Sequence, residues 1–421
     1  MNISYFDDVR VTNKKIAVAL KTLQVYRETI NDYVERGVLT VPECSLYYLK
    51  DSSLHITLAR LEKKYKKIKH LILVGIGGSS LGLEAVHAVL NRGQVELSVL
   101  DTVSVERLHE VMTAVKKYKR ASDIAICVIS KSGHTTETLV NASALLDHLR
   151  ARFGDAIYTQ LICIGDSGTP LMKFANRVKA EIVTMPGSIG GRYSVATAVG
   201  LVPMALLRHD VDEFMDGYLD ALSSTHESVV AESAARLACY ENLGYNHYSF
   251  FAFETRLLRL GQWYRQLFAE SLGKAKTEAG VGVKRVMVPT IATPVELHSI
   301  GQLYLSGVAP VYTDFVTFDD ETLDVMLPKR NPIAPNLAGY SLQEVATALY
   351  GGVIGAYQER KLPYRATVFE DNLAYSLGLF MAMRLREVMY TAKLLGRNAF
   401  DQPNVELYKT KTSDILFNRG T

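Results

Sequence analysis

The sequence predicts an α/β protein with two doubly wound subdomains, mostly parallel sheets, and helical segments at both ends of the chain. Three observations support this prediction. Short apolar segments alternate with segments of helical periodicity, the alternation occurs twice, and 421 residues are enough for two to three domains. Apolar strands buried on both faces are typical of parallel sheets covered by helices, so each alternation predicts one such unit.

The first alternation follows an N-terminal segment, residues 1–65, that we expect to be helical. It predicts two intervening helices, Leu81–Leu90 and Thr136–Leu149, and an apolar helix within residues 193–207. The expected strands are His70–Gly75, Glu96–Leu100, Ile124–Ile129, Leu161–Ile164 and Glu181–Met185. Together these elements predict a first subdomain at residues 66–210.

The second alternation follows a charged amphipathic stretch, Asp210–Tyr240, which predicts a helix or helix pair that links the two halves at residues 211–245. The second subdomain is expected at residues 246–396, and residues 397–421 form a C-terminal tail. Its expected strands are Val286–Thr290, Val311–Phe318 and Ala366–Phe369, and its expected helices are Phe250–Leu267, Ser299–Leu305, Ser341–Glu359 and Asn372–Leu395. Gly396 is a favoured residue for ending the last helix.

Composition favours a globular protein, with 48% hydrophobic and 22% charged residues. The net charge is only +3, so the chain lacks the basic field that gathers nucleic acid, and no nucleic-acid partner is expected. The basic run at residues 63–69 is interpreted as the solvated end of a helix.

Cysteine usage and the termini indicate a cytoplasmic protein. The four cysteines, Cys44, Cys127, Cys163 and Cys239, have no metal-ligand spacing, which predicts a reduced compartment and no structural zinc. The N-terminus is acidic where a signal peptide would be basic and apolar. No uncharged apolar run reaches the roughly 20 residues of a membrane helix, so no membrane partner is expected.

The first polar turn lies in HLILVGIGGSSLGLEAV, residues 70–86, between an expected strand and an expected helix. Gly75, Gly77 and Gly78 allow a ligand to approach the backbone, and Ser79 and Ser80 add hydroxyl groups. A helix N-terminus attracts phosphate through its free N–H groups. The spacing departs from the G-x-G-x-x-G of a dinucleotide site, although this pattern alone does not exclude one.

A second polar turn, CVISKSGHTTETLV at residues 127–140, is more informative. It places a lysine and five hydroxyl groups at the mouth of a helix, namely Ser130, Lys131, Ser132, Thr135, Thr136 and Thr138. A helix cap needs one or two such residues, so capping by Thr135 and Thr138 alone explains the turn poorly. Because ligands of open α/β sheets bind at the carboxyl ends of strands, the turn predicts a phosphate site there.

At these two turns the chain resembles phosphosugar isomerases of the SIS fold, and specifically the glucose-6-phosphate isomerase family. The resemblance continues through four further blocks in the order of that family, from about residue 70 to residue 410. These blocks are SIGGRYSVATAVGL (188–201), WYRQLFAESLGK (263–274), TPVELHSIGQLYLSG (293–307) and FDQPNVELYK (400–409).

The resemblance implies cofactor-free interconversion of glucose 6-phosphate and fructose 6-phosphate, a step of glycolysis and gluconeogenesis, through an enediolate. It implies Glu270 as the base, Arg192 facing the enediolate, His298 opening the sugar ring with Glu137 as its carboxylate partner, and Lys409 at the substrate. The implied substrate-binding residues are Gly78, Ser79, Ser130, Lys131, Ser132, Thr135, Thr138, Gly191 and Gln402. No metal ligand is implied.

These residue types suit the chemistry, because proton abstraction beside a carbonyl needs a base and an enediolate needs a fixed cation. Each also has a structural alternative. Glu270 could pair with Lys274 one turn later on a helix surface, and Arg192 could be a solvated surface arginine. His298 could be a structural histidine. If the tail is helical, Lys409 lies two turns beyond Gln402 on the same face.

Three positions depart from the family pattern. His134 stands in the phosphate loop where threonine is common, and Glu296 stands near His298 where aspartate is more usual. Asn404 replaces a common glycine, and asparagine tolerates the left-handed backbone well.

The resemblance also implies a homodimer with shared active sites, because the ring-opening histidine of the family reaches into the neighbouring subunit. Three alternative functions stay open. They are a dual phosphoglucose/phosphomannose isomerase, a non-catalytic sugar-phosphate sensor, and an NAD-dependent dehydrogenase, which the hydroxyl-rich second turn disfavours.

Overall fold

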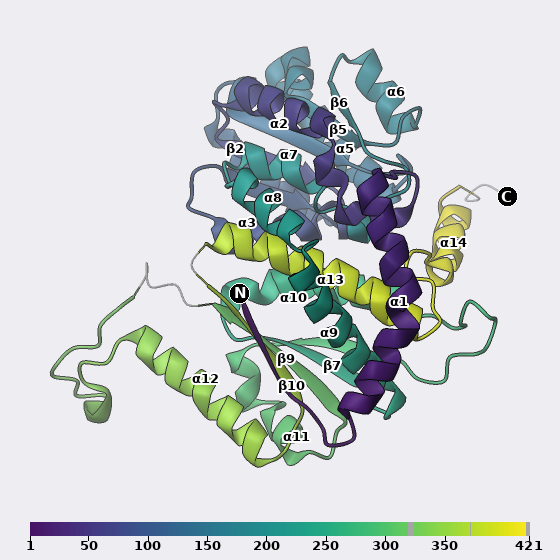
Figure 1. Cartoon of the computed structure of the whole chain (residues 1–421). Coiled ribbons are helices and arrows are strands. Elements are labelled where there is room, and N and C mark those ends of the chain that lie inside the picture. Colours follow the sequence, from purple (N-terminus) through teal and green to yellow (C-terminus); the bar gives the residue numbers. More distant parts are fainter. Residues whose placement is uncertain (319–323, 371, 418–421) are drawn as a thin grey trace.

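The computed structural model describes residues 1–318, 324–370 and 372–417, and it contains two five-stranded sheets (Figure 1). In the first sheet the strand order is β3-β2-β4-β5-β6 and every neighbouring pair is parallel. Its strands are β2 (His70–Val74), β3 (Glu96–Leu100), β4 (Ile124–Ile129), β5 (Leu161–Gly165) and β6 (Glu181–Thr184). All five strands predicted for the first alternation are therefore confirmed.

Helices cover both faces of this sheet. Alternate residues of β2 point to opposite cores: Leu71 and Leu73 join one apolar cluster, and Ile72 and Val74 join the other. The surrounding helices are α2 (Ser52–Tyr65), α3 (Leu81–Leu90), α4 (Val105–Ala114), α5 (Thr136–Phe153), α6 (Pro170–Arg177) and α7 (Ala198–Leu206). The unit is doubly wound, as predicted.

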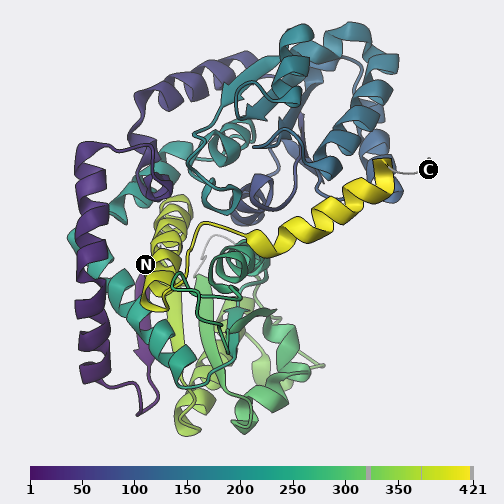
Figure 2. The same cartoon turned by 90° about the vertical axis from the view of Figure 1, so that its right-hand side faces the viewer.

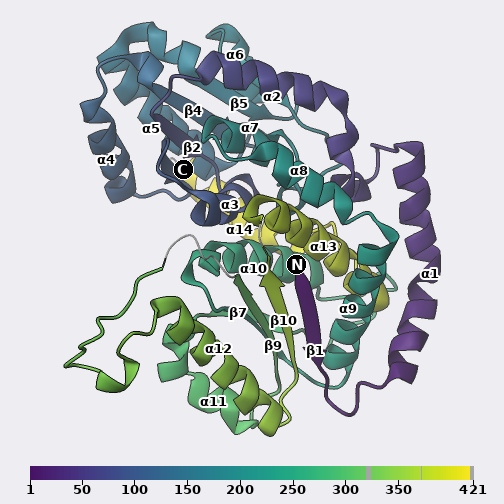
Figure 3. The ribbon, with the colours of Figure 1, turned by 60° about the vertical axis from the view of Figure 1, so that its left-hand side comes forward.

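The two sheets are linked by helices that pack side by side (Figure 3). The predicted charged linker is a helix pair, α8 (Val211–Asp220) and α9 (Ser224–Asn242). Both pack against α13 (Leu373–Leu394), whose N-cap is Asn372 and which is buried along most of its length. The long N-terminal helix α1 (Asn13–Arg36) lies against α9 and α13.

The second sheet has the strand order β1-β10-β9-β7-β8. Its strands are β1 (Asn2–Phe6), β7 (His247–Ala252), β8 (Val288–Ala292), β9 (Val311–Phe318) and β10 (Tyr364–Phe369). Only β1 is antiparallel to its neighbour, and the other pairs are parallel. The helices of this half are α10 (Leu258–Leu272), α11 (Gly301–Ser306) and α12 (Leu342–Glu359).

Two sequence predictions need correction at the second sheet. The segment 1–65, expected to be helical, contains α1 and α2, but its first residues form β1, which pairs with β10 with Asn2 opposite Val368 and Phe6 opposite Tyr364. The helix predicted at Phe250–Leu267 begins only at Leu258, since Phe250 lies in strand β7. The aromatic side chains of β7 are buried on both faces of the sheet, and a run that is apolar on both faces carries no periodicity to separate strand from helix.

A buried ion network anchors α10 to the second sheet. Arg365 on β10 contacts Asp314 on β9 at 2.6 Å between Nη2 and Oδ2, and Arg384 contacts Glu387 at 3.1 Å. The hydroxyl of Tyr264, on α10, donates to Glu387 Oε2 at 2.7 Å. Two arginines therefore balance two carboxylates, and the network fixes the helix that carries Glu270.

The tail projects from the body of the molecule as helix α14 (Glu406–Phe417), drawn yellow in Figure 2. Its side chains from Glu406 to Leu416 are exposed. The last four residues of the predicted tail, 418–421, lie outside the described part of the chain.

Candidate active site

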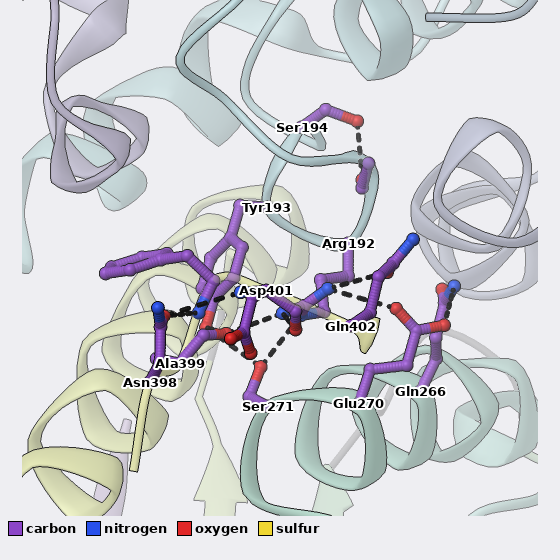
Figure 4. Close-up of polar contacts among 12 residues, drawn as sticks. Arg192, Tyr193, Ser194, Gln266, Glu270, Ser271, Asn398, Ala399, Asp401 and Gln402 are labelled. Atoms are coloured by element: carbon purple, nitrogen blue, oxygen red, sulfur yellow. Dashed lines mark hydrogen bonds and ion pairs between the residues drawn. The ribbon is translucent and has the colours of Figure 1, made fainter. Parts of the chain in front are cut away.

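The centre of the candidate site is a contact between a buried arginine and a carboxylate (Figure 4). Arg192 lies in a short 3-10 helix, Gly191–Tyr193, after the first sheet, and it is 4% exposed. Its Nη1 lies 3.2 Å from Oε2 of Glu270, on the last turn of α10, and donates to Oε1 of Gln402 at 3.0 Å. Three segments distant in sequence thus meet at one guanidinium group.

The remaining nitrogens of Arg192 fix its orientation. Nε donates to Ser271 Oγ at 2.9 Å, and Nη2 donates to the carbonyls of Ala399 at 2.6 Å and Asp401 at 3.0 Å. Because these acceptors satisfy a buried cation from several directions, the arginine is preorganised. The alternative of a solvated surface arginine is wrong.

Glu270 does not pair with Lys274 through its carboxylate, as the structural alternative required. Lys274 instead donates to the backbone carbonyl of Glu270 at 2.7 Å. The carboxylate accepts from Gln266 Nε2 at 2.9 Å through its other oxygen, and the side chain is 32% exposed. Glu270 is therefore held by two donors while part of its carboxylate surface stays accessible.

Gln266 is a site residue that the sequence analysis missed. It lies one turn before Glu270 on α10, so the i, i+4 spacing places both side chains on one face. Its amide also lies against the first polar turn, because a Cβ at Gly77 would sit 2.8 Å from Gln266 Nε2. This spacing is the signal that could have identified it.

The first polar turn lies directly on the segment that carries Arg192. A Cβ at Gly78 would come within 2.2 Å of the carbonyl group of Gly191, so only glycine fits at position 78. Ser79, next to it, is partly exposed in the 3-10 turn that precedes α3. Gly78, Ser79 and Gly191 are thus brought together with Arg192.

The second polar turn follows β4, which is hydrogen-bonded to β2, so both turns lie at the same edge of the sheet. Ser130 Oγ and Thr135 Oγ1 are 3.0 Å apart, and the Thr138 hydroxyl is buried without a hydrogen-bond partner in the chain. Thr135 is the N-cap residue of α5, yet its side chain makes no capping bond. Neither Thr135 nor Thr138 therefore uses its hydroxyl group to cap the helix, which favours an anion site over simple capping as the role of this turn.

Two other residues complete this turn. Lys131 Nζ donates to the carbonyl of Gly187 at 2.7 Å, and Ser132 Oγ accepts from the backbone N–H of His134 at 3.3 Å. His134, which departs from the family pattern, is exposed.

Three predicted catalytic residues are not joined to this centre within one chain. His298 is exposed at the end of the 3-10 helix Pro294–His298, in the half of the chain that forms the second sheet. Glu137 is partly exposed on α5, beside the first sheet. Lys409 is exposed on α14, where its Nζ pairs with Glu406 at 2.7 Å. Among the described residues, no hydrogen bond or ion pair links any of the three to Arg192 or Glu270.

The structure also shows the local environment of Gln402 in the tail and of the two other positions that depart from the family pattern, Asn404 and Glu296. Gln402 precedes α14 instead of lying within it, so Gln402 and Lys409 do not share a helix face. Asn404 lies in the 3-10 helix Pro403–Val405 and does not adopt a positive φ. Glu296 caps its own helix, accepting from the Thr293 backbone and hydroxyl at 2.6 Å each, which lowers the pKa of the Glu296 carboxyl despite some burial.

Within the ranges 1–318, 324–370 and 372–417, no group of three or more His, Cys, Asp or Glu side chains is arranged to hold a metal ion. No helix in the same part of the chain combines the length and apolarity that a bilayer crossing requires.

Fold and site together define a doubly wound α/β protein of the SIS class, with an arginine–carboxylate centre between two units whose sheets are mostly parallel. A family model described as phosphoglucose isomerase matches residues 49–322. The chain belongs to this phosphoglucose isomerase family.

Similar proteins agree with this assignment. A glucose-6-phosphate isomerase of Lactobacillus helveticus is 30% identical over 411 residues, covering 91% of this chain and 87% of the relative. One of Clostridium tetani is 27% identical over 98% of this chain and 93% of the relative. A solved structure of a hypothetical protein from Thermus thermophilus has a TM-score of 0.86 and 26% identity, with 99% of this chain and 100% of the other covered. A glucose-6-phosphate isomerase structure from Chlamydia trachomatis, at 18% identity, shares the fold with a TM-score of 0.81 over 98% of this chain and 88% of the other.

Proposed function

We propose that the chain is an enzyme that interconverts glucose 6-phosphate and fructose 6-phosphate through an enediolate, with Glu270 as the base. The observation that carries this proposal is the buried Arg192 guanidinium, 3.2 Å from the partly exposed Glu270 carboxylate. A base and a fixed cation side by side are what an enediolate intermediate requires. Membership of the phosphoglucose isomerase family and the names of the relatives support the substrate pair.

The reaction needs two proton movements on the open-chain sugar. Glu270 takes the proton from C2 of the aldose, and the electrons of that C–H bond form the enediolate. Arg192 faces the developing negative charge on oxygen and stabilises it more than the neutral ground state. The proton returns to C1, while the C2 hydroxyl loses its proton and the C1 oxygen gains one, which gives the ketose.

Substrate binding depends on the two polar turns. The Ser130 and Thr135 hydroxyls and the buried Thr138 hydroxyl support a phosphate site after β4. Gly78, Ser79 and Gly191 lie beside Arg192 and support a sugar-facing surface. Gln402, bound to Arg192, and Gln266, bound to Glu270, are suited to contact sugar hydroxyls.

The test is turnover of fructose 6-phosphate to glucose 6-phosphate without any added nucleotide, followed by NMR. Turnover is expected, and its absence in folded protein would favour a sugar-phosphate sensor. The same measurement with mannose 6-phosphate separates a phosphoglucose isomerase from a dual phosphoglucose/phosphomannose isomerase.

We also propose a homodimer with shared active sites. His298 and Lys409 are exposed, so in a single chain neither completes the centre. Apolar side chains around His298 and α12 are exposed, including Val295 at 70%, Leu303 at 48% and Leu349 at 55%. Exposed apolar side chains of this kind, two of them within five residues of a histidine that the family places in the neighbouring site, support a second copy of the chain as the occupant of this face.

Subunit mixing tests the shared site. Inactive His298→Ala chains mixed with inactive Glu270→Gln chains should regain about a quarter of wild-type activity, because half of the dimers are mixed and each has one intact site. Light scattering should report twice the mass of one chain. A fully active monomer, or no recovery after verified subunit exchange, would leave His298 to act within its own chain.

We further propose a cytoplasmic location, which the family's place in sugar-phosphate metabolism supports. The proposed units are an N-terminal segment at residues 1–65, subdomains at 66–210 and 246–396, linking helices at 211–245 and a tail at 397–421. Strand β1 crosses this division, because it completes the second sheet.

A further inference from the structure

Lys274 is a buried lysine that the proposed chemistry does not use. It lies two residues beyond the end of α10 and is 7% exposed. Its three N–H donors meet three acceptors: the Glu270 carbonyl at 2.7 Å, the Asp401 carbonyl, and the Asp401 carboxylate at 2.9 Å. Burial lowers the pKa of Lys274, and the hydrogen bond to Asp401 opposes this effect. A buried ammonium group is tolerated only when its donors are satisfied in this way.

The acceptors of Lys274 connect two parts of the active centre. The Glu270 carbonyl is one of the last four of α10, which have no partner inside the helix, and a cation there stabilises the helix end. The Asp401 carbonyl is shared, because Arg192 Nη2 also donates to it at 3.0 Å. Gln402, the next residue, accepts from Arg192 Nη1.

We propose that Lys274 is a positioning residue that ties the end of α10 to Asp401 and thereby keeps Gln402 and Arg192 aligned with the Glu270 carboxylate. The proposal rests on the proposed isomerase function. Lys274 itself does not contact that carboxylate, so its effect on the reaction passes through the segment that contains Asp401 and Gln402. A displacement of about 1 Å in such a centre can cost about 10²-fold in rate.

The main variant is Lys274→Met, which keeps an apolar stem of the same length and removes the ammonium group with all three donors. A cavity of about 520 Å³ borders Lys274 and Asp401 and leaves space for the new side chain. We expect kcat to fall by about 10-fold to 10²-fold while KM for fructose 6-phosphate changes by less than about threefold, because the phosphate turns are untouched. Lys274→Arg keeps the charge and donors and should recover most of kcat.

The matched control is Lys276→Met, a loss of the same charge at an exposed position in the same segment. It should leave kcat, KM and the unfolding midpoint at wild-type values. Amide hydrogen exchange supplies a readout that does not depend on activity: residues 399–405 should exchange faster in Lys274→Met and at the wild-type rate in Lys276→Met.

Asp401→Ala covers the case in which Lys274→Met fails to fold. The Asp401 side chain is 50% exposed, so this variant should fold, and kcat should fall by about threefold to tenfold since the backbone carbonyl remains. Any of three results would overturn the proposal. The first is folded Lys274→Met with wild-type kcat, and the second is Lys274→Arg with a kcat no higher than that of Lys274→Met. The third is Asp401→Ala with wild-type kcat and wild-type amide exchange rates. A wild-type chain without isomerase activity would instead refute the proposed function, and the exchange rates would still decide whether Lys274 holds the segment.

Discussion

Replacing Glu270 with glutamine tests the proposed base directly. The variant keeps the shape of the side chain and one carbonyl oxygen, but it removes the carboxylate that is proposed to carry the proton between C1 and C2. Arg192 loses one partner and keeps Ser271, Gln402 and two backbone carbonyls, so its position should not change. The altered carboxylate is one-third exposed, and the buried guanidinium keeps its other acceptors, so the variant should fold.

The expected loss follows from the role of the residue. General-base catalysis contributes about 10²-fold to 10⁴-fold, and a loss of 10²-fold corresponds to about 2.7 kcal/mol of transition-state stabilisation. Because the phosphate turns are far along the chain from Glu270 and are unchanged, KM for fructose 6-phosphate should change little. The decrease should appear in kcat and kcat/KM together.

The assay is NMR of fructose 6-phosphate in D₂O, which reports conversion to glucose 6-phosphate and deuterium uptake at C1 and C2 separately. Glu278→Gln, eight residues further along the chain at an exposed position, is the matched control and should behave as wild type. If Glu270→Gln retains turnover within about threefold of wild type, then Glu270 is not the base and the reasoning from the Arg192 contact fails.

Three further predictions concern the phosphate turn, metals and acid stability. Ser130→Ala with Thr135→Ala should raise KM, since phosphate contacts act in ground and transition states alike, and an unchanged KM in folded protein would argue against the site. Activity should survive EDTA, because Arg192 can supply the positive charge; loss that zinc or manganese restores would indicate a metal-dependent mechanism. Burial alone would raise the pKa of Glu387, but Arg365 and Arg384 outweigh it and lower that pKa to about 2. The contribution of ionised Glu387 to the free energy of unfolding is fully present above pH 4.5, the usual pKa of a glutamate, and is lost as the pH falls toward 2. The urea concentration at the unfolding midpoint should therefore decrease across that interval. A midpoint that does not change with pH would contradict a stabilising role of the network.

The sequence predicted the first sheet well, because its strands are buried on both faces and separated by clear polar turns. Strand β4, with all six residues buried, is a continuous apolar run between Asp123 and the serine-rich turn. The strand β1 was missed because it lies at a sheet edge and its side chains are only partly buried. Its pairing with β10 depends on a segment more than 350 residues away, which no local pattern reveals.

The same distinction applies to the site. Arg192, Glu270 and Gln402 could be proposed from motifs, and the structure brings them together. Lys274 and Asp401 could not, because their contact depends on how the end of α10 meets the tail. His298 and Lys409 remain predictions, since one chain leaves both exposed.

The two sheets differ in when their strands leave the ribosome. The first sheet draws all five strands from residues 70–184, so it can fold while the rest of the chain is still being made. The second sheet joins the earliest strand, β1, to the latest, β10, and closing so large a loop is slow. During synthesis β1 therefore stays unpaired until residue 369 has emerged, and the α10 surface that carries Glu270 lacks its completed sheet until then. We expect nascent chains that stop before β10 to fold their first half and to need protection for the second.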